Sequence, residues 1–170
     1  MKEVAGDLIK LDKNGKFDVI VHGCNCQCIM GGGIAKQIRQ AFPKAYDADC
    51  RTTACDSRKI GSFSFAKVKV NNGNHLVIVN GYTQLLAGGQ VKYDAVREVI
   101  KKVKQNFYGQ RIGYPMIGSG LAGGDWDRIK DIIAELSCTR PRNVFRFFLD
   151  ANDMPRHYAR HVATYPRHSR

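Results

Sequence analysis

The sequence predicts an α/β fold with three layers, in which helices cover both faces of a central mixed sheet. Short apolar segments bounded by turn residues indicate strands, and apolar residues at helical spacing fill the intervals between them. This alternation is typical of layered α/β domains. Glycine-rich loops follow two of the apolar segments, as in sheets that bind ligands beyond the carboxyl ends of their strands. The expected strands are 3–5, 17–22, 59–70, 75–80, 110–116 and 143–149.

Three stretches have the apolar spacing of helices that pack on a sheet. The first is expected to begin near Ile34, and Pro141 is expected to end the third. The stripes are Ile34, Ile38, Ala41 and Phe42; Val96, Val99, Ile100, Val103 and Phe107; and Trp126, Ile129, Ile132, Ile133 and Leu136. Each stripe is interpreted as core.

The segment 71–74 reads Asn-Asn-Gly-Asn and predicts a hairpin turn. A hairpin joins neighbouring strands directly, whereas the other expected strands are separated by longer, partly helical connections. The sheet is therefore expected to be mixed.

A length of 170 residues suits one domain with a single core, which we assign to 1–150. The segment 151–170 is a basic C-terminal tail, either a short helix or partly disordered. In it Arg156, Arg160, Arg167 and Arg170 oppose only Asp153.

The net charge of +12 favours a polyanionic partner or a nucleotide, although a solvated helix face accounts equally well for the lysines between 92 and 104. No apolar run approaches the roughly 20 residues of a membrane span, and the N-terminus lacks the pattern of a signal peptide. We therefore expect a cytoplasmic monomer without membrane contact.

The six cysteines are expected to be reduced in that compartment. Cys24, Cys26 and Cys28 alternate with single residues, unlike the paired C-x2-C spacing of zinc sites. No metal site and no cofactor are predicted.

A β-branched run at 19–21 leads to three successive glycines at 31–33, which open a helix. Glycine lets the backbone approach a ligand closely, and the first turn of a helix has N–H groups without intrahelical partners. This arrangement suits a phosphate group. The alternative is that the glycines only permit a tight turn.

Several motifs occur in a particular order along the chain. They are Gly6-Asp7-Leu8, His22-x-Cys24-Asn25-Cys26, Gly31-Gly32-Gly33-Ile34-Ala35, and the glycine-rich loop Ile117-Gly118-Ser119-Gly120-Leu121-Ala122-Gly123-Gly124. Over about residues 1 to 150 the sequence resembles the macrodomain family, whose members bind ADP-ribose and its derivatives. The His22 and Gly31 motifs are most similar to the branch that hydrolyses ADP-ribose 1″-phosphate to ADP-ribose and phosphate.

The resemblance implies a set of ligand-binding positions. Asp7 would accept a hydrogen bond from the adenine amine, although an Asx turn or helix cap explains it equally well, and Leu8 would offer a backbone donor. Asn25 would face the distal ribose. The diphosphate would lie between two loops, formed by Gly31, Gly32, Gly33 and Ile34 and by Ile117, Ser119, Gly120 and Leu121.

The candidate catalytic residues are His22, Asn25 and Asp125. His22 would protonate the departing ribose oxygen or attack phosphorus, and the alternative is a buried structural histidine. Asp125 precedes a helical pattern, so a capping role is the alternative there.

This chain departs from macrodomains that remove ADP-ribose from carboxylate side chains through a lysine and an aspartate. Ala122 stands where their aspartate would follow the glycine loop, and the segment Val79-Asn80-Gly81-Tyr82 has no lysine. Alternative functions are an ADP-ribosyl or O-acetyl-ADP-ribose hydrolase, a non-catalytic reader of ADP-ribosylated protein or nucleic acid, and an unrelated basic nucleic-acid-binding domain.

Overall fold

The structure, a computed structural model, describes residues 2–5, 8–9, 16–70, 73–138 and 145–149. The strands are β1 (Lys2–Ala5), β2 (Val19–Asn25), β3 (Phe63–Lys69), β4 (His75–Gln84), β5 (Ile112–Pro115) and β6 (Phe145–Leu149). The helices are α2 (Gly33–Ala41), α3 (Pro43–Cys50), α4 (Tyr93–Asn106) and α5 (Trp126–Cys138), and a 3₁₀ turn, η1, spans Ser57–Lys59.

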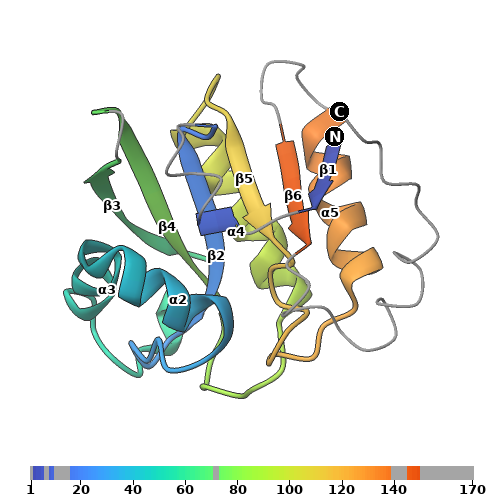
Figure 1. The fold of residues 1–170 in the computed structure, drawn as a ribbon. Coiled ribbons are helices and arrows are strands. Elements are labelled where there is room, and N and C mark those ends of the chain that lie inside the picture. Colours follow the sequence, from blue (N-terminus) through green and yellow to red (C-terminus); the bar gives the residue numbers. More distant parts are fainter. Residues whose placement is uncertain (1, 6–7, 10–15, 71–72, 139–144, 150–170) are drawn as a thin grey trace.

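The six strands form one sheet in the order β1-β6-β5-β2-β4-β3 (Figure 1). Only β3 and β4 are antiparallel, and the other neighbours are parallel. The expected mixed sheet is therefore confirmed, and each expected strand is present with shifted ends. The antiparallel pair agrees with a hairpin at 71–74, although residues 71 and 72 themselves lie outside the described part of the chain.

Two apolar clusters fill the space between the sheet and the helices on either side of it. Because successive side chains of a strand point to opposite faces, Val19 and Val21 of β2 join the cluster under α4 and α5, whereas Ile20 joins the cluster under α2. All three expected helical stripes contribute to these clusters. The α/β/α architecture follows from this division, with α2 and α3 on one face and α4 and α5 on the other (Figure 1).

The apolar spacing of the sequence did not predict α3. Pro43 occupies its first turn, where the missing N–H of proline is tolerated. The buried residues of this helix are Ala45, Ala48 and Asp49 rather than large apolar side chains. A helix with such a small apolar face gives little periodic signal, and only its packing against the sheet makes it evident.

The expected strand at 59–70 begins later than predicted. Residues 57–59 form η1, in which the Asp56 side chain accepts a hydrogen bond from the Arg58 N–H. A turn through Gly61, with φ of +74°, then leads into β3. Asp7 and the tail 150–170 lie outside the described residues. Among the helices that are described, none is long and apolar enough to cross a membrane.

Candidate functional site

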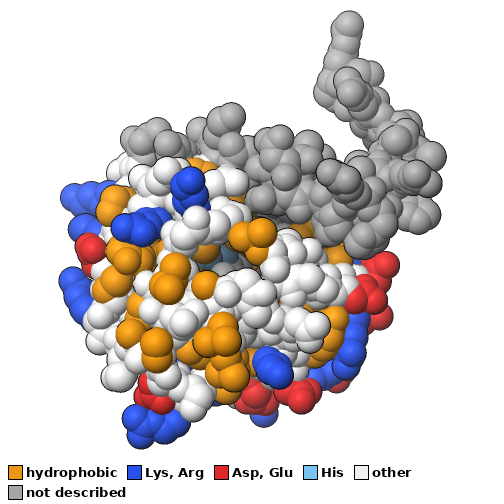
Figure 2. All heavy atoms as spheres, turned by 90° about the horizontal axis from the view of Figure 1, so that it is seen from below, with side chains coloured by type: hydrophobic (Ala, Val, Ile, Leu, Met, Phe, Trp, Pro, Cys, Tyr) orange, Lys and Arg blue, Asp and Glu red, His pale blue; other side chains and the backbone are white. Residues whose placement is uncertain are grey.

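A cleft of about 1090 Å³ opens at the carboxyl ends of β2 and β5. Residues from three segments line it. Each segment begins at the carboxyl end of a strand and continues into the loop that follows: 23–35 from β2, 84–88 from β4, and 115–124 from β5. Figure 2 looks onto this end of the molecule, where hydrophobic side chains gather around the middle and Lys and Arg lie mainly near the margin. Ligands of parallel α/β sheets bind at this end of the strands.

The first wall of the cleft is the glycine segment 31–33, which leads into α2. Gly32 is the N-cap and supplies no side-chain cap, so the helix presents backbone N–H groups to the cleft. A Cβ on Gly32 would lie only 2.6 Å from Leu121 Cδ1. Leu121, which is 71% exposed, therefore reaches across from the opposite wall toward these glycines.

The second wall is the glycine-rich loop after β5. Gly118 and Gly123 both have positive φ, and the Gly124 N–H donates to the Gly118 carbonyl at 2.9 Å. The Ser119 hydroxyl donates to the Met116 carbonyl at 2.8 Å, so its hydrogen is already engaged. These bonds fold the loop back on itself and form the wall.

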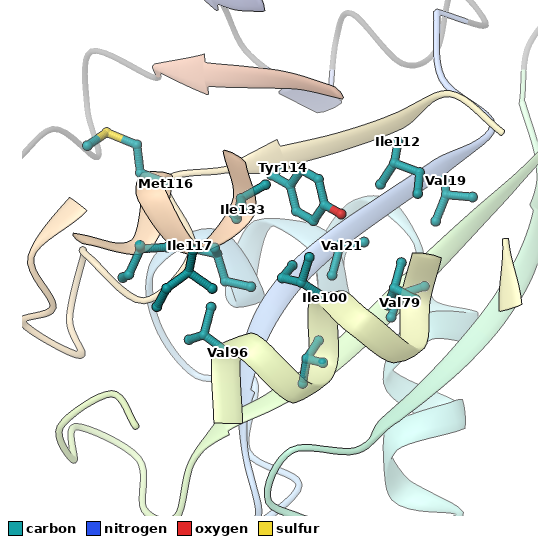
Figure 3. Packing of buried hydrophobic residues seen from close by; sticks show 14 of the residues in the cluster. Val19, Val21, Val79, Val96, Ile100, Ile112, Tyr114, Met116, Ile117 and Ile133 are labelled. Atoms are coloured by element: carbon teal, nitrogen blue, oxygen red, sulfur yellow. The ribbon is translucent and has the colours of Figure 1, made fainter. Parts of the chain in front are cut away.

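Four residues of this loop were predicted to contact ligand. Ser119, Gly120 and Leu121 line the cleft, whereas Ile117 does not. Ile117 is buried in the cluster under α4 and α5, and Figure 3 shows it beside Val96 of α4.

Asn25 ends β2 and lines the cleft with 7% of its surface exposed. Its Oδ1 accepts from the N–H groups of Gln27 (2.9 Å) and Ile29 (3.3 Å), and its Nδ2 donates to the Ile29 carbonyl at 2.7 Å. The side chain thus clamps the loop that precedes the glycines. One Nδ2 hydrogen is left to meet a ligand.

The structure places His22 behind the cleft wall. Its side chain lies on the face of β2 opposite to that of Asn25, and the residue is fully buried. Its Nε2 lies 2.9 Å from Asn80 Oδ1, and Cys24 Sγ lies 3.6 Å from Nδ1. Burial lowers the pKa of His22 to about 4, so the ring is neutral at pH 7. His22 is absent from the residues that line the cleft.

Asp125 is also outside the cleft lining. Its Oδ1 accepts from the N–H groups of Asp127 (2.9 Å) and Arg128 (3.4 Å), which is the geometry of an N-cap of α5. Leu8 is buried in the apolar cluster that includes Ile20. The cleft therefore brings together Asn25 and the two glycine loops, but not His22, Asp125 or Leu8.

The sequence patterns did not predict the third wall, which begins at the end of β4. Gln84, Ala87 and Gly88 line the cleft there. The Gln27 side chain accepts from the Ala87 N–H at 2.7 Å and so ties this wall to the loop after β2. The available signal was the glycine pair at 88–89, which follows a strand as the other two glycine loops do.

The chemistry of the described lining is that of backbone amides and neutral side chains. None of the described lining residues is Asp, Glu, Lys, Arg or His. Nor does the described part of the chain hold three His, Cys, Asp or Glu side chains close enough to bind a metal ion. Burial raises the pKa of the Cys24 and Cys26 thiols. This lining suits recognition of an anion by hydrogen bonds to the backbone.

Comparison with known proteins identifies relatives of this chain. A family model described as Macro domain matches residues 21–133. An uncharacterized 17.5 kDa protein in the tk-vs intergenic region of Enterobacteria phage T4 is 35% identical over 140 residues, which are 78% of this chain and 87% of the relative. An ADP-ribose 1″-phosphate phosphatase of Scheffersomyces stipitis is 35% identical over 65 residues, 35% of this chain and 38% of that protein.

Among solved structures, Thermosipho africanus DarTG in complex with ADP-ribose superposes with a TM-score of 0.70 at 13% identity. The match covers 94% of this chain and 44% of that chain. At this identity the likeness shows that the fold is shared.

Proposed function

Because the chain belongs to the macro domain family, we propose that its cleft binds ADP-ribose. The observation that carries the proposal is the pair of glycine loops that face each other across the cleft, one of them at the N-terminus of α2. A volume of about 1090 Å³ is sufficient for a nucleoside diphosphate sugar. The ADP-ribose complex of the Thermosipho africanus relative supports the same ligand.

In the proposed complex, the diphosphate accepts hydrogen bonds from backbone N–H groups of Gly32, Gly33 and Ile34. The remaining Nδ2 hydrogen of Asn25 meets a hydroxyl of the distal ribose. Leu121 covers the diphosphate from the opposite wall. The dipole of α2 and the protein's net charge of +12 offset the ligand's negative charge, since the described lining has no cationic side chain. The proposed adenine contact is that of Asp7, which lies outside the described residues.

The proposed reaction at this site is hydrolysis of ADP-ribose 1″-phosphate to ADP-ribose and phosphate. The partial similarity to the Scheffersomyces stipitis phosphatase favours it. Phosphoryl transfer depends mainly on positioning and on electrostatic stabilisation of the transferred group, which backbone donors can supply. Asn25 is the proposed catalytic residue that touches substrate. His22 is proposed to act as a positioning residue. Its ring is neutral and bonded to Asn80, and this bond fixes the carboxyl end of β2, where Asn25 lies.

A non-catalytic reader of ADP-ribosylated protein or nucleic acid is the second candidate. It is favoured by the lack of Asp, Glu, Lys, Arg and His side chains among the described residues that line the cleft. A reader needs affinity and access but no group that transfers a proton.

Calorimetric titration with ADP-ribose tests binding, and a ³¹P NMR time course with ADP-ribose 1″-phosphate tests the reaction. Growth of inorganic phosphate supports the phosphatase. Diphosphate signals that shift while the monoester persists support the reader. Neither heat nor shifted diphosphate signals, from a protein shown to be folded by circular dichroism, would contradict ADP-ribose binding. Gly32→Ala is the matched control, since it alters the proposed phosphate cradle and leaves the apolar core untouched.

A further inference from the structure

A cluster of buried polar side chains lies behind the loop that leads into the glycines. Lys59 is only 8% exposed, and its Nζ lies 3.2 Å from Cys28 Sγ and 3.2 Å from the Cys26 carbonyl oxygen. The same ammonium lies 3.8 Å from Asp49 Oδ1 and 4.3 Å from the centre of the Tyr82 ring. A lysine held this far from water acts strongly on its neighbours, because solvent screens it little.

The acidic member of the cluster is not fully satisfied. Asp49 Oδ1 accepts from the Tyr82 hydroxyl at 2.8 Å, whereas Oδ2 is buried without a hydrogen-bond partner. The Asp49 side chain is 1% exposed. The cluster around Lys59 and Cys28 therefore contains a buried acceptor that no described donor uses.

Cys28 is the member of the cluster that is partly accessible to solvent. Its Sγ donates to the Asp49 carbonyl at 3.2 Å and lies 3.5 Å from Thr52 Oγ1. The residue has φ of +59°, which is unfavourable for residues other than glycine. The contacts of the sulfur with Lys59, Asp49 and Thr52 hold the backbone in this conformation.

An ammonium group 3.2 Å from a partly exposed sulfur is an environment in which a cysteine reacts readily with disulfides. The other described cysteines differ. Cys24 and Cys26 are buried, and burial raises the pKa of each thiol. Cys50 and Cys55 are exposed, so their rates of modification show the effect of solvent exposure alone.

Cys28 is also coupled to the cleft. It precedes Ile29, whose N–H and carbonyl are both bound by the Asn25 side chain, and the chain then runs through the buried Met30 to Gly31. A group attached to Sγ cannot occupy the space between Lys59 and the Asp49 carbonyl. It therefore displaces the segment that positions Asn25 and the glycines.

We propose that Cys28 is a modification site for low-molecular-weight disulfides, and that the mixed disulfide weakens ligand binding in the cleft. The Cys28 thiolate attacks one sulfur of the reagent, forming a new S–S bond as the reagent's own S–S bond breaks. The leaving thiolate takes up the proton that Cys28 lost, and excess free thiol reverses the exchange. The effect on affinity rests on the proposed binding of ADP-ribose.

The test uses the full chain with oxidised glutathione, peptide mass spectrometry to locate the adduct, and calorimetry with ADP-ribose. We expect Cys28 to gain glutathione at least as fast as Cys50 and Cys55, although it is less exposed. The modified wild-type protein should bind ADP-ribose at least about tenfold more weakly, and dithiothreitol should restore the affinity. Cys28→Ser is the matched control, because adducts on other cysteines persist in it and its affinity should be the same before and after treatment with oxidised glutathione.

Cys28 that stays unmodified while Cys50 and Cys55 react overturns the modification site. An adduct on Cys28 that leaves the affinity unchanged overturns the coupling. If unmodified protein fails to bind ADP-ribose, the proposed function fails, but amide hydrogen exchange over 26–33 still tests the inference. Faster exchange in the modified wild-type protein than in treated Cys28→Ser supports displacement of the loop, and equal exchange overturns it.

Discussion

The imidazole of His22 and the amide of Asn80 form a buried pair, with Nε2 2.9 Å from Oδ1. The Asn80 Nδ2 in turn donates to the Ala45 carbonyl at 2.8 Å and to Ser64 Oγ at 3.0 Å. The pair therefore connects β2 and β4 to α3 behind the cleft. Its burial has a consequence for stability.

The free energy of unfolding should decrease as the pH falls below the ordinary pKa of His22. The folded-state pKa of about 4 lies below the ordinary value of 6.5, so the unfolded chain takes up a proton first. Stability is then lost between about pH 6.5 and 4, by roughly 3 kcal/mol in total. Urea unfolding across this range measures the slope of the unfolding free energy against pH. In His22→Gln the slope should be much smaller, and an unchanged slope would assign it to other groups.

Gly32→Ala should reduce affinity for ADP-ribose while leaving the fold intact. Gly32 has φ of −149°, which alanine adopts readily, but the new Cβ would lie 2.6 Å from Leu121 Cδ1. Leu121 is exposed and can move. We expect an affinity at least about tenfold lower, or about 1.4 kcal/mol, by calorimetry, with an unchanged urea midpoint. Gly32→Ala/Leu121→Ala removes the close contact. The double variant is compared with Leu121→Ala alone. Equal affinities would attribute the loss to displaced Leu121, and a further loss in the double variant would attribute it to a blocked phosphate cradle.

Asn25→Asp should weaken ADP-ribose binding through both charge and geometry. Aspartate retains an acceptor for the Gln27 and Ile29 N–H groups but loses the donor to the Ile29 carbonyl. It also adds a negative charge to the cleft that is proposed to hold the anionic ligand. We expect Kd to rise at least about tenfold, and high salt to relieve part of this increase. Gln84→Glu places the same charge on another wall. An equal loss in both variants would show that Asn25 has no particular role.

Asp125→Ala should destabilise the protein without affecting the cleft. The Asp125 carboxylate accepts from the Asp127 and Arg128 N–H groups at the start of α5. Loss of such a cap costs about 1 kcal/mol, and Asp125→Ser should retain most of it. Urea unfolding measures the difference. A loss of ADP-ribose affinity or of turnover in Asp125→Ser, at unchanged stability, would instead support a catalytic role.

Lys59→Met should strongly destabilise the fold, because it leaves the Asp49 carboxylate buried without its cation. Breaking one side of a buried ion pair costs roughly 3–5 kcal/mol. Asp49→Asn/Lys59→Met removes the charge and retains an acceptor for the Tyr82 hydroxyl. The double variant should therefore be more stable than Lys59→Met in denaturant unfolding. The reverse order would show that Asp49 does not depend on Lys59.

The sequence by itself predicted the layers of this fold and the segments that form two walls of the cleft. Apolar spacing identified all six strands and the buried faces of α2, α4 and α5, because those faces are made of large side chains. The glycine loops at 31–33 and 118–124 were evident because each combines several glycines directly after a strand. Both kinds of signal are local, because each strand, helix face or glycine loop is encoded within one continuous stretch of sequence.

Tertiary structure decided which polar side chains reach the cleft. His22 and Asn25 are three residues apart in β2, so strand alternation puts their side chains on opposite faces of the sheet. Which face is covered was decided by packing: α3, absent from the predicted elements, lies over the face with His22, where Asn80 bonds to both His22 and the Ala45 carbonyl. Asp125 and Asp49 likewise acquire their roles from partners that the sequence alone does not place: the first turn of α5 for one, Lys59 and Tyr82 for the other. Burial and hydrogen bonding between distant segments are properties of the packed chain, and periodicity carries no information about them.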